Sequence, residues 1–440
     1  MSGEYTALFM FPCMMLSVFS GFPVAFCLMG IALIFGIFGF GTSLSPMLIR
    51  RIYGMADNYV LAAVPLFIFM GTMLERSGIA KRLFESISIW TGRLRGGLAI
   101  ATILMCTIIA ACTGIIGASE VMVGVMAIPA MLKRKYNHPL ICGTICAGGA
   151  LGTLIPPSVV TVVYGPSAGI SVGRLLIATI LPGLLLSSIY ICYIAVRSHL
   201  SPDFAPPIPA EETKLPFKEK LAITATGMVP SMVLIFSVLG SIVFGWSAPT
   251  EAAALGAFGS ILLTIAYRNF TWIALRETVI LTLKMSSMIM VILTGGSMFS
   301  SVFLGMGGGT ATEKVLAALN LGPWGVLALF LFIVYLAGFV LDWASILLVF
   351  VPIFSPIIDK LGFDPIWFGA LFIMMIQTSY LTPPMAPAIF YLKGIAPPEI
   401  TTNEIFKGIW IYMLLQLLGI SIVTIFPQVA LWLPSKLIGF

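Results

Sequence analysis

Uncharged apolar stretches of about 20 residues follow one another along the whole sequence. As a helix, each stretch is long enough to cross the hydrocarbon core of a bilayer, which is about 30 Å thick. Only 9% of the residues are charged, whereas a soluble domain carries about 25%. Because helices of this length satisfy their own backbone hydrogen bonds in lipid, the sequence predicts an all-α polytopic membrane protein.

The apolar stretches predict about ten full membrane spans. These cover residues 6–21, 23–41, 58–75, 139–165, 174–197, 222–246, 250–267, 277–303, 364–392 and 405–432. The first stretch lacks the basic flank of a secretory signal peptide, so no cleaved leader is expected.

Two further regions, 97–132 and 322–358, are predicted to be re-entrant hairpins. Each is interrupted in its middle by small or polar residues, at 113–119 and at 338–342. The halves are too short for a full crossing. Irregular backbone is tolerated at membrane depth only where protein or a water-filled cavity surrounds it.

The distribution of basic residues predicts the orientation. With both termini in the periplasm, 17 of the 23 Lys and Arg residues fall in cytoplasmic segments and 6, including Arg50 and Arg51, in periplasmic ones. This follows the positive-inside rule for a bacterial inner membrane. The net charge of +6 therefore belongs to loops, and no nucleic-acid partner is expected.

An internal repeat divides the chain. Pro156-Pro157 recurs 227 residues later as Pro383-Pro384, and Tyr164 recurs at the same spacing as Tyr391. Each half then holds three spans, a hairpin, a broken span and a final span, and the halves begin on opposite sides of the membrane. The predicted organisation is a first inverted repeat over 1–197, a cytoplasmic linker over 198–221 and a second inverted repeat over 222–440.

Inverted repeats with interrupted helices at matching positions are typical of secondary transporters whose site lies near the bilayer midplane. A Pro-Pro pair removes backbone donors and frees the carbonyls of the preceding turn, which can then bind a dehydrated cation. The sequence has no Walker loop, nucleophile elbow or zinc-ligand spacing. The expected protein is therefore an ion-driven carrier and not an enzyme, with no metal beyond sodium.

Ionisable residues inside spans are costly and become candidates for function. Asp342, at the second hairpin tip, could bind a cation beside Thr382, cap the following helix, or do both. Glu120 could cap its helix or line a cavity. Glu251 is interpreted as structural, at a helix start capped by Thr250.

No Arg or Lys is predicted at mid-depth, so an anionic substrate would be held by helix N-termini, hydroxyls and amides, with sodium as the countercharge. For each hydroxyl the alternative is a hydrogen bond within its own helix. The candidate substrate-lining residues are Ser119, Ser158, Tyr164, Ser345, Gln377 and Tyr391.

Two shorter segments, 79–92 and 310–321, have an amphipathic pattern. They occupy equivalent places before the two hairpins, on opposite sides of the predicted membrane. Interfacial helices that link moving and fixed parts are one interpretation, and plain loops are the other.

Several motifs resemble the large permease subunit of tripartite ATP-independent periplasmic (TRAP) transporters over essentially the whole chain. They are Gly152–Ser158, Tyr164-Gly165, Leu181-Pro182-Gly183, Ala248–Ala254 and Leu381–Pro384. The resemblance implies an elevator-type fold of a wider ion-transporter superfamily. It also implies a small four-helix membrane subunit and a periplasmic substrate-binding protein as partners, and a sodium gradient as the driving force.

The resemblance also implies two sodium sites. The residues concerned are Thr113, Gly114, Gly152, Ile155 and Pro157 for the first site, and Gly338, Asp342, Thr382 and Met385 for the second. Many members carry Gly-Ser-Ser where this chain has Gly114-Ile115-Ile116, so the hydroxyl ligands are expected from Thr113 or Ser119 instead. Residues 341–343 and 390–394 resemble a subgroup associated with 2-oxo, lactate-like or aromatic acids.

The expected function is sodium-driven import of small organic acids, either 2-oxo and 2-hydroxy monocarboxylates or C4-dicarboxylates. A stand-alone sodium/carboxylate symporter of the same superfamily is the nearest alternative, and an ion channel or intramembrane enzyme is a distant one. Dependence of uptake on a binding protein separates the first two.

Overall fold

The structure is a computed structural model that describes residues 3–114, 116–209, 216–383 and 386–437. Over these ranges the secondary structure is helical, with no strand. Eight helices in the described ranges are long and apolar enough to cross a membrane. The predicted class, an all-α polytopic membrane protein, is confirmed.

In the first half of the chain the helices are α1 (Gly3–Leu8), α2 (Met10–Phe19), α3 (Val24–Phe40), α4 (Leu44–Ala56), α5 (Ala63–Arg76), α6 (Ile79–Thr91), α7 (Gly97–Thr113), α8 (Ile116–Lys133), α9 (His138–Ala150), α10 (Val159–Ala168) and α11 (Val172–Leu200). Short 3₁₀ helices cover Gly41–Ser43, Tyr59–Ala62, Leu151–Thr153 and Pro202–Phe204.

In the second half they are α12 (Phe217–Val243), α13 (Pro249–Ala266), α14 (Trp272–Gly305), α15 (Gly308–Ala318), α16 (Pro323–Ala337), α17 (Trp343–Lys360), α18 (Pro365–Leu381), α19 (Pro387–Ile395), α20 (Thr402–Ile425) and α21 (Gln428–Leu437).

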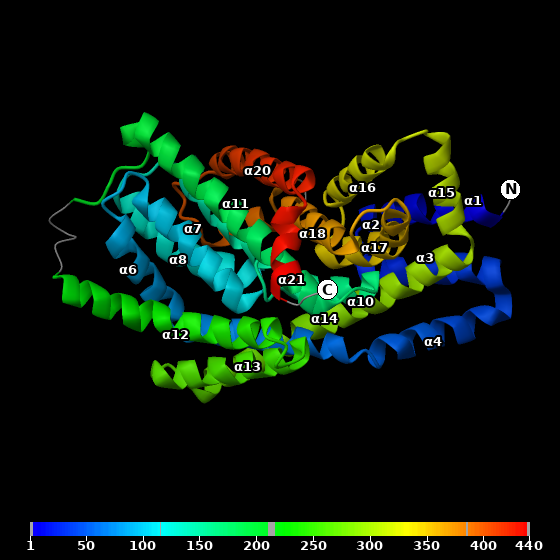
Figure 1. Ribbon diagram of the computed structural model, residues 1–440, viewed down its shortest axis with the longest axis horizontal. Coiled ribbons are helices and arrows are strands. Elements are labelled where there is room, and N and C mark those ends of the chain that lie inside the picture. Colours follow the sequence, from blue (N-terminus) through cyan, green and yellow to red (C-terminus); the bar gives the residue numbers. More distant parts are fainter. Residues whose placement is uncertain (1–2, 115, 210–215, 384–385, 438–440) are drawn as a thin grey trace.

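Figure 1 shows an elongated bundle in which α12, α13, α14 and α4 run along one edge. The rest of the bundle lies to one side of this edge. It contains the two hairpins, α7–α8 and α16–α17, and the two interrupted helices, α9–α10 and α18–α19. The interrupted helices pack on the hairpins, with α8 against α9 and α17 against α18. Helix pairs and helix interruptions therefore lie at the predicted positions, while the re-entrant course of the hairpins and the inverted repeats stay predictions.

The amphipathic segments are helices and not plain loops. Figure 1 shows α6 at one end of the long axis and α15 at the other. Each leads directly into a hairpin, α6 into α7 and α15 into α16. The α6 helix is fastened to α12 by two hydrogen bonds, from Trp90 Nε1 to Thr224 Oγ1 (2.8 Å) and from Ser86 Oγ to the carbonyl of Ile223 (3.0 Å).

Two predicted spans differ from the structure. Residues 6–21 form α1 and α2, which are separated by Phe9 alone and together make an apolar helix over Tyr5–Phe19 that is shorter than the predicted span. The span predicted over 405–432 ends at Ile425, and α21 then turns across the bundle beside α11. Pro427 has no backbone N–H and disfavours helical backbone at Phe426, which accounts for the second break.

The α4 helix, Leu44–Ala56, lies in a region that was predicted to be a periplasmic loop. Its Leu44 and Leu48 are buried one turn apart, whereas Arg50 and Arg51 are exposed. The two arginines lower the hydropathy of this segment, so apolar length alone does not detect it. The spacing of its buried leucines is the signal that identifies an amphipathic helix.

The seven cysteines all lie in described residues and are free thiols. Cys192 on α11 is exposed and Cys13 on α2 is half-buried. The others are buried, namely Cys27, Cys106, Cys112, Cys142 and Cys146.

Candidate functional site

At the first hairpin tip, α7 meets the break between α9 and α10. Gly114 ends α7 with a φ of +61°, and a Cβ placed on it would lie 2.4 Å from the carbonyl oxygen of Pro157. Both the left-handed conformation and the close approach require glycine. The tip and the break are therefore in direct backbone contact.

The hydroxyls at this tip are paired with each other. Thr113 Oγ1 lies 2.8 Å from Ser119 Oγ and donates to the carbonyl of Ile109 at 3.0 Å. The carbonyl of Thr113 faces α5, where a Cβ on Gly71 would lie 2.7 Å from it. The first tip is therefore packed on both sides by glycines that allow close approach.

The helix break itself is buried. Gly152 belongs to the 3₁₀ turn Leu151–Thr153, and Ile155 follows it with its backbone N–H donating to Leu151 at 2.9 Å. Ser158 precedes α10, and its hydroxyl donates to the carbonyl of Thr153. Of the five residues predicted for the first sodium site, Thr113, Gly114 and Pro157 are thus brought together, and Gly152 and Ile155 lie in the same break. Their role as sodium ligands stays a prediction.

At the second hairpin tip, Asp342 is the N-cap of α17. Its Oδ2 accepts from the backbone N–H of Ala344 at 3.2 Å, and its Oδ1 accepts from the hydroxyl of Ser345. The capping interpretation of Asp342 is confirmed. Gly338 packs closely on α18, because a Cβ added to it would lie 2.3 Å from the Cβ of Ser379.

A cavity of about 50 Å³ lies at this tip. Gly338 and Asp342 line it from the hairpin, and Ser379 and Tyr380 line it from the last turn of α18. A cavity this small admits an ion or a few water molecules. Carboxylate, hydroxyl and carbonyl oxygens are the ligands that hard cations prefer. The sequence did not single out Ser379 and Tyr380, although their place just before Pro383-Pro384 mirrors that of the first break.

Thr382 lies beside this cavity but does not line it. Its hydroxyl donates to the carbonyl of Thr378 at 2.7 Å and lies 3.6 Å from the sulfur of Met413. The hydroxyl is therefore tied back to its own helix, and Met385 falls outside the described residues.

The predicted substrate-lining residues separate into three groups. Tyr164 and Gln377 are fully buried on α10 and α18, and neither the phenol oxygen nor the amide has a hydrogen-bond partner among the described residues. Ser119, Ser158 and Ser345 are also buried, and they bond to Thr113, Thr153 and Asp342 as described above. Tyr391 on α19 is 44% exposed, with its ring against Gly117 of the first hairpin.

Glu120 neither caps α8 nor lines a described cavity. It lies in the fifth position of α8 and is fully buried, and no hydrogen-bond partner of its carboxylate oxygens lies in the described chain. A Cβ added to Gly149 of α9 would lie 2.9 Å from the Cβ of Glu120. The Cys146 thiol lies beside the carboxyl but donates to the carbonyl of Ala388 (3.8 Å).

Glu251 has the structural role that its position predicts. Its Oε2 accepts from the backbone N–H of Ala248 at 2.8 Å, at the start of α13. Thr250 is not the cap, because Ala248 precedes the helix and Thr250 lies within it.

Two hairpins that meet the breaks of two interrupted helices, inside a bundle of apolar helices, define a membrane carrier. The chain belongs to the family of the tripartite ATP-independent periplasmic transporter, DctM component, whose model matches residues 11–429. It is therefore a large permease subunit of the inner membrane and not an enzyme.

Its relatives include named permeases of several bacteria. The C4-dicarboxylate TRAP transporter large permease protein DctM of Pseudomonas aeruginosa is 31% identical over 395 residues, covering 88% of this chain and 89% of that protein. The sialic acid TRAP transporter large permease protein SiaM of Vibrio cholerae is 26% identical, covering 96% and 97%. The 2,3-diketo-L-gulonate TRAP transporter large permease protein YiaN of Escherichia coli is 25% identical, covering 97% and 98%.

The fold is also similar to a solved structure, the YdaH transporter of Alcanivorax borkumensis. The TM-score is 0.65, and the likeness covers 97% of this chain and 99% of that one. Because the sequences are only 15% identical, this similarity concerns the fold alone.

Proposed function

We propose that this permease subunit imports small organic acids together with sodium ions. The observation that carries the proposal is the second hairpin tip, where the Asp342 carboxylate borders a cavity of ion size beside an interrupted helix. No basic residue lines this cavity within the described chain, so a bound cation is the natural countercharge of the carboxylate.

The substrate class is supported by the chemistry named for the relatives. C4-dicarboxylate, sialic acid and 2,3-diketo-L-gulonate all carry a carboxylate group. Small 2-oxo and 2-hydroxy monocarboxylates and C4-dicarboxylates are therefore the acids proposed for this chain. Sodium bound at the two tips would neutralise an acid held by the hydroxyls nearby.

We further propose the partners and orientation that the family implies. These are a small four-helix membrane subunit, a periplasmic binding protein that delivers the acid, and periplasmic N- and C-termini. The exposed apolar faces of α12 and α13, for example at Phe236 and Phe258, suit contact with lipid or with the helices of a partner.

The mechanism proposed is an elevator movement of the hairpins and interrupted helices against the remaining helices. The connections support it, because α6 and α15 are the elements that lead into the two hairpins. A disulfide that joins α7 to α11 through cysteines at Thr107 and Ser187, whose hydroxyls lie 2.7 Å apart outside the candidate site, would lock the first hairpin. Transport should stop on oxidation and return on reduction, and full transport by the locked protein would contradict the elevator.

The direct test is uptake of labelled pyruvate, lactate and succinate into proteoliposomes that contain this chain and its small subunit. Each acid is tested with and without the binding protein and with and without an inward sodium gradient. Uptake that needs both sodium and the binding protein supports the proposal. Sodium-driven uptake that ignores the binding protein would indicate a stand-alone symporter, and uptake without sodium would refute the coupling.

A further inference from the structure

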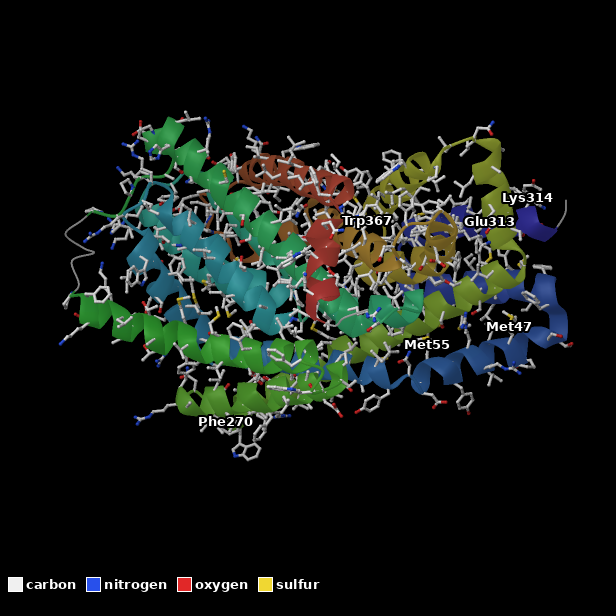
Figure 2. All side chains as sticks on the ribbon, in the orientation of Figure 1. Met47, Met55, Phe270, Glu313, Lys314 and Trp367 are labelled. Carbon is white, nitrogen blue, oxygen red and sulfur yellow. The ribbon has the colours of Figure 1, made fainter. Side chains whose placement is uncertain are left out.

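A second cavity lies away from the hairpin tips, between α4, α10, α14 and α17. Its volume is about 710 Å³, which is ample for a small organic acid. We call it the arginine vestibule; the polar residues that line it include Arg50, Arg51, Asn58, Ser297, Ser300 and Ser301. Figure 2 labels Met47 and Met55, two of the residues by which α4 contributes to the same wall.

The charge of the vestibule has one sign. Arg50 and Arg51 line it, and no Asp or Glu is among the described residues that do so. The nearest acid along α4 is Asp57, which follows the helix, lies about 10 Å from Arg50 along its axis and does not line the cavity. A cavity with two guanidinium groups and no carboxylate attracts anions.

Arg51 is held in one orientation. Its Nε donates to Ser301 Oγ at 2.6 Å, and Ser301 Oγ in turn donates to the carbonyl of Ser297 at 2.7 Å. The terminal nitrogens of Arg51 are left available for a ligand. Arg50 makes no hydrogen bond or ion pair with any residue that the structure describes, so its whole guanidinium group is available.

The vestibule borders the elements that carry the candidate sodium sites. Ser300 Oγ donates to the carbonyl of Leu348 on α17 at 2.7 Å, and Leu348 lies one turn beyond Ser345. On the other side Val163 of α10 lines the vestibule, next to Tyr164. An anion bound by the arginines would therefore lie beside the helices that lead to both tips.

We propose that Arg50 and Arg51 bind the carboxylate of the incoming acid in the vestibule, before it reaches the hairpin tips. This inference rests on the proposed function and adds an entry site to it. The planar guanidinium group pairs with a carboxylate through two parallel hydrogen bonds, which a lysine cannot reproduce. A phospholipid phosphate has a similar chemistry, and the experiment separates the two sources.

The first measurement is the concentration dependence of uptake by the reconstituted complex with its binding protein. Arg50→Gln combined with Arg51→Gln should raise the half-saturating acid concentration by about 10-fold or more, because charge-assisted hydrogen bonds are lost. Arg50→Lys combined with Arg51→Lys should give an intermediate value. Arg174→Gln, which removes an exposed arginine from the predicted same side of the membrane, should leave it unchanged.

The second measurement does not depend on transport. Phenylglyoxal modifies accessible arginines, and mass spectrometry of the purified complex reports its rate at Arg50 and at Arg174. Added succinate or pyruvate should slow modification of Arg50 but not of Arg174. Liposomes of phosphatidylcholine alone, compared with liposomes containing phosphatidylglycerol, show whether an anionic lipid gives the same protection.

The entry site is supported if the acid slows phenylglyoxal modification of Arg50 in phosphatidylcholine liposomes and if the double Gln variant has a raised half-saturating acid concentration. Protection by phosphatidylglycerol alone, with unchanged half-saturation, would overturn it in favour of a lipid site. Unchanged half-saturation and no protection by acid, in a wild-type complex that transports, would overturn it while the proposed function stands. If the wild type transports none of the acids but Arg50 is still protected, the proposed function fails and the anion site remains.

Discussion

At the first hairpin tip α7 ends on a left-handed glycine, Gly114, whereas at the second tip residues 338–342 lead to an aspartate that caps α17. The first tip presses its backbone against Pro157 and pairs its hydroxyls with each other. The second tip leaves a cavity of about 50 Å³ beside a carboxylate. The difference teaches that both hairpins place a tip against a helix break, while the polar groups available to a cation differ between the two tips.

Gly114→Ala tests the role of backbone contact at the first tip. The added Cβ would meet the Pro157 carbonyl, so the tip must move away from the break. A displacement of about 1 Å at a site can cost 100-fold in rate, and transport is expected to fall by about that factor. Initial rates of acid uptake in proteoliposomes measure it.

The control for this variant is Gly169→Ala. Gly169 also has a positive φ of +70°, at the end of α10, but no atom lies within 4 Å of an added Cβ. It should show the strain of the left-handed conformation alone and keep most of its transport. Equal loss in the two variants would show that strain, and not contact with Pro157, matters at the first tip.

Asp342→Asn tests the role of charge at the second tip. Asparagine caps a helix about as well as aspartate, so α17 should persist while the negative charge is lost. The sodium concentration for half-maximal uptake should rise by about 10-fold or more. Asp364→Asn is the matched control, because Asp364 caps α18 through Ile366 and Trp367 away from the cavity. An unchanged sodium dependence in Asp342→Asn would assign Asp342 to capping alone.

Glu120→Met tests the buried carboxyl of the first hairpin. Methionine has a similar length and leaves no polar atom without a partner, so unfolding should become less favourable by about 1–3 kcal/mol. Glu251→Met should have the opposite effect, because the N–H of Ala248 loses its acceptor. Melting temperatures in detergent measure both, and a destabilised Glu120→Met would reveal an interaction of the carboxyl that its surroundings do not show.

The base of the first hairpin should respond to high pH. The hydroxyl of Tyr136 accepts from the backbone N–H of Leu98 at 3.2 Å, and burial raises the pKa of Tyr136 to about 12. The folded state therefore keeps this proton while the unfolded chain loses it near pH 10, so the contribution to stability is complete below pH 10 and lost as the pH rises toward 12. Melting temperatures should fall less between pH 9 and 11 in Tyr136→Phe than in the wild type. Identical slopes would contradict this assignment.

A substitution at the base of the second hairpin should have the smallest effect on stability. There Lys360 Nζ lies 2.6 Å from Glu313 Oε1, and both side chains are largely exposed; Figure 2 labels Glu313 on α15. Lys360→Gln should change the free energy of unfolding by less than about 1 kcal/mol. Urea titration in detergent measures the change, and a larger effect would mean that the α15–α17 contact stabilises the hairpin.

The membrane explains why so much of this fold is predictable from sequence. A crossing needs about 20 apolar residues, so the length of each apolar segment distinguishes the spans from the hairpins, whose helices are shorter. Pro156-Pro157 and Pro383-Pro384 mark the two helix breaks. The α4 helix escapes the same reasoning because it faces a polar cavity with Arg50 and Arg51 and is not uniformly apolar.

The candidate site is less predictable because its geometry depends on contacts between distant segments. Asp342 can be identified as an unusual charge in an apolar region, but the cavity beside it needs the approach of Ser379, 37 residues later. The isolation of Glu120 likewise depends on Gly149, which lets α9 close over it. Such approaches between helices leave no periodic signal in the sequence.

The placement of the cysteines has a practical consequence for labelling chemistry. A thiol reacts as its thiolate, which forms poorly where water is excluded. Five of the seven thiols are buried and Cys13 is half-buried, and the exposed Cys192 belongs to α11, a helix long and apolar enough to cross the membrane. Polar maleimides and spin labels should therefore react mainly with cysteines introduced at water-exposed positions, so that distances between the two hairpins can be followed in the natural sequence background.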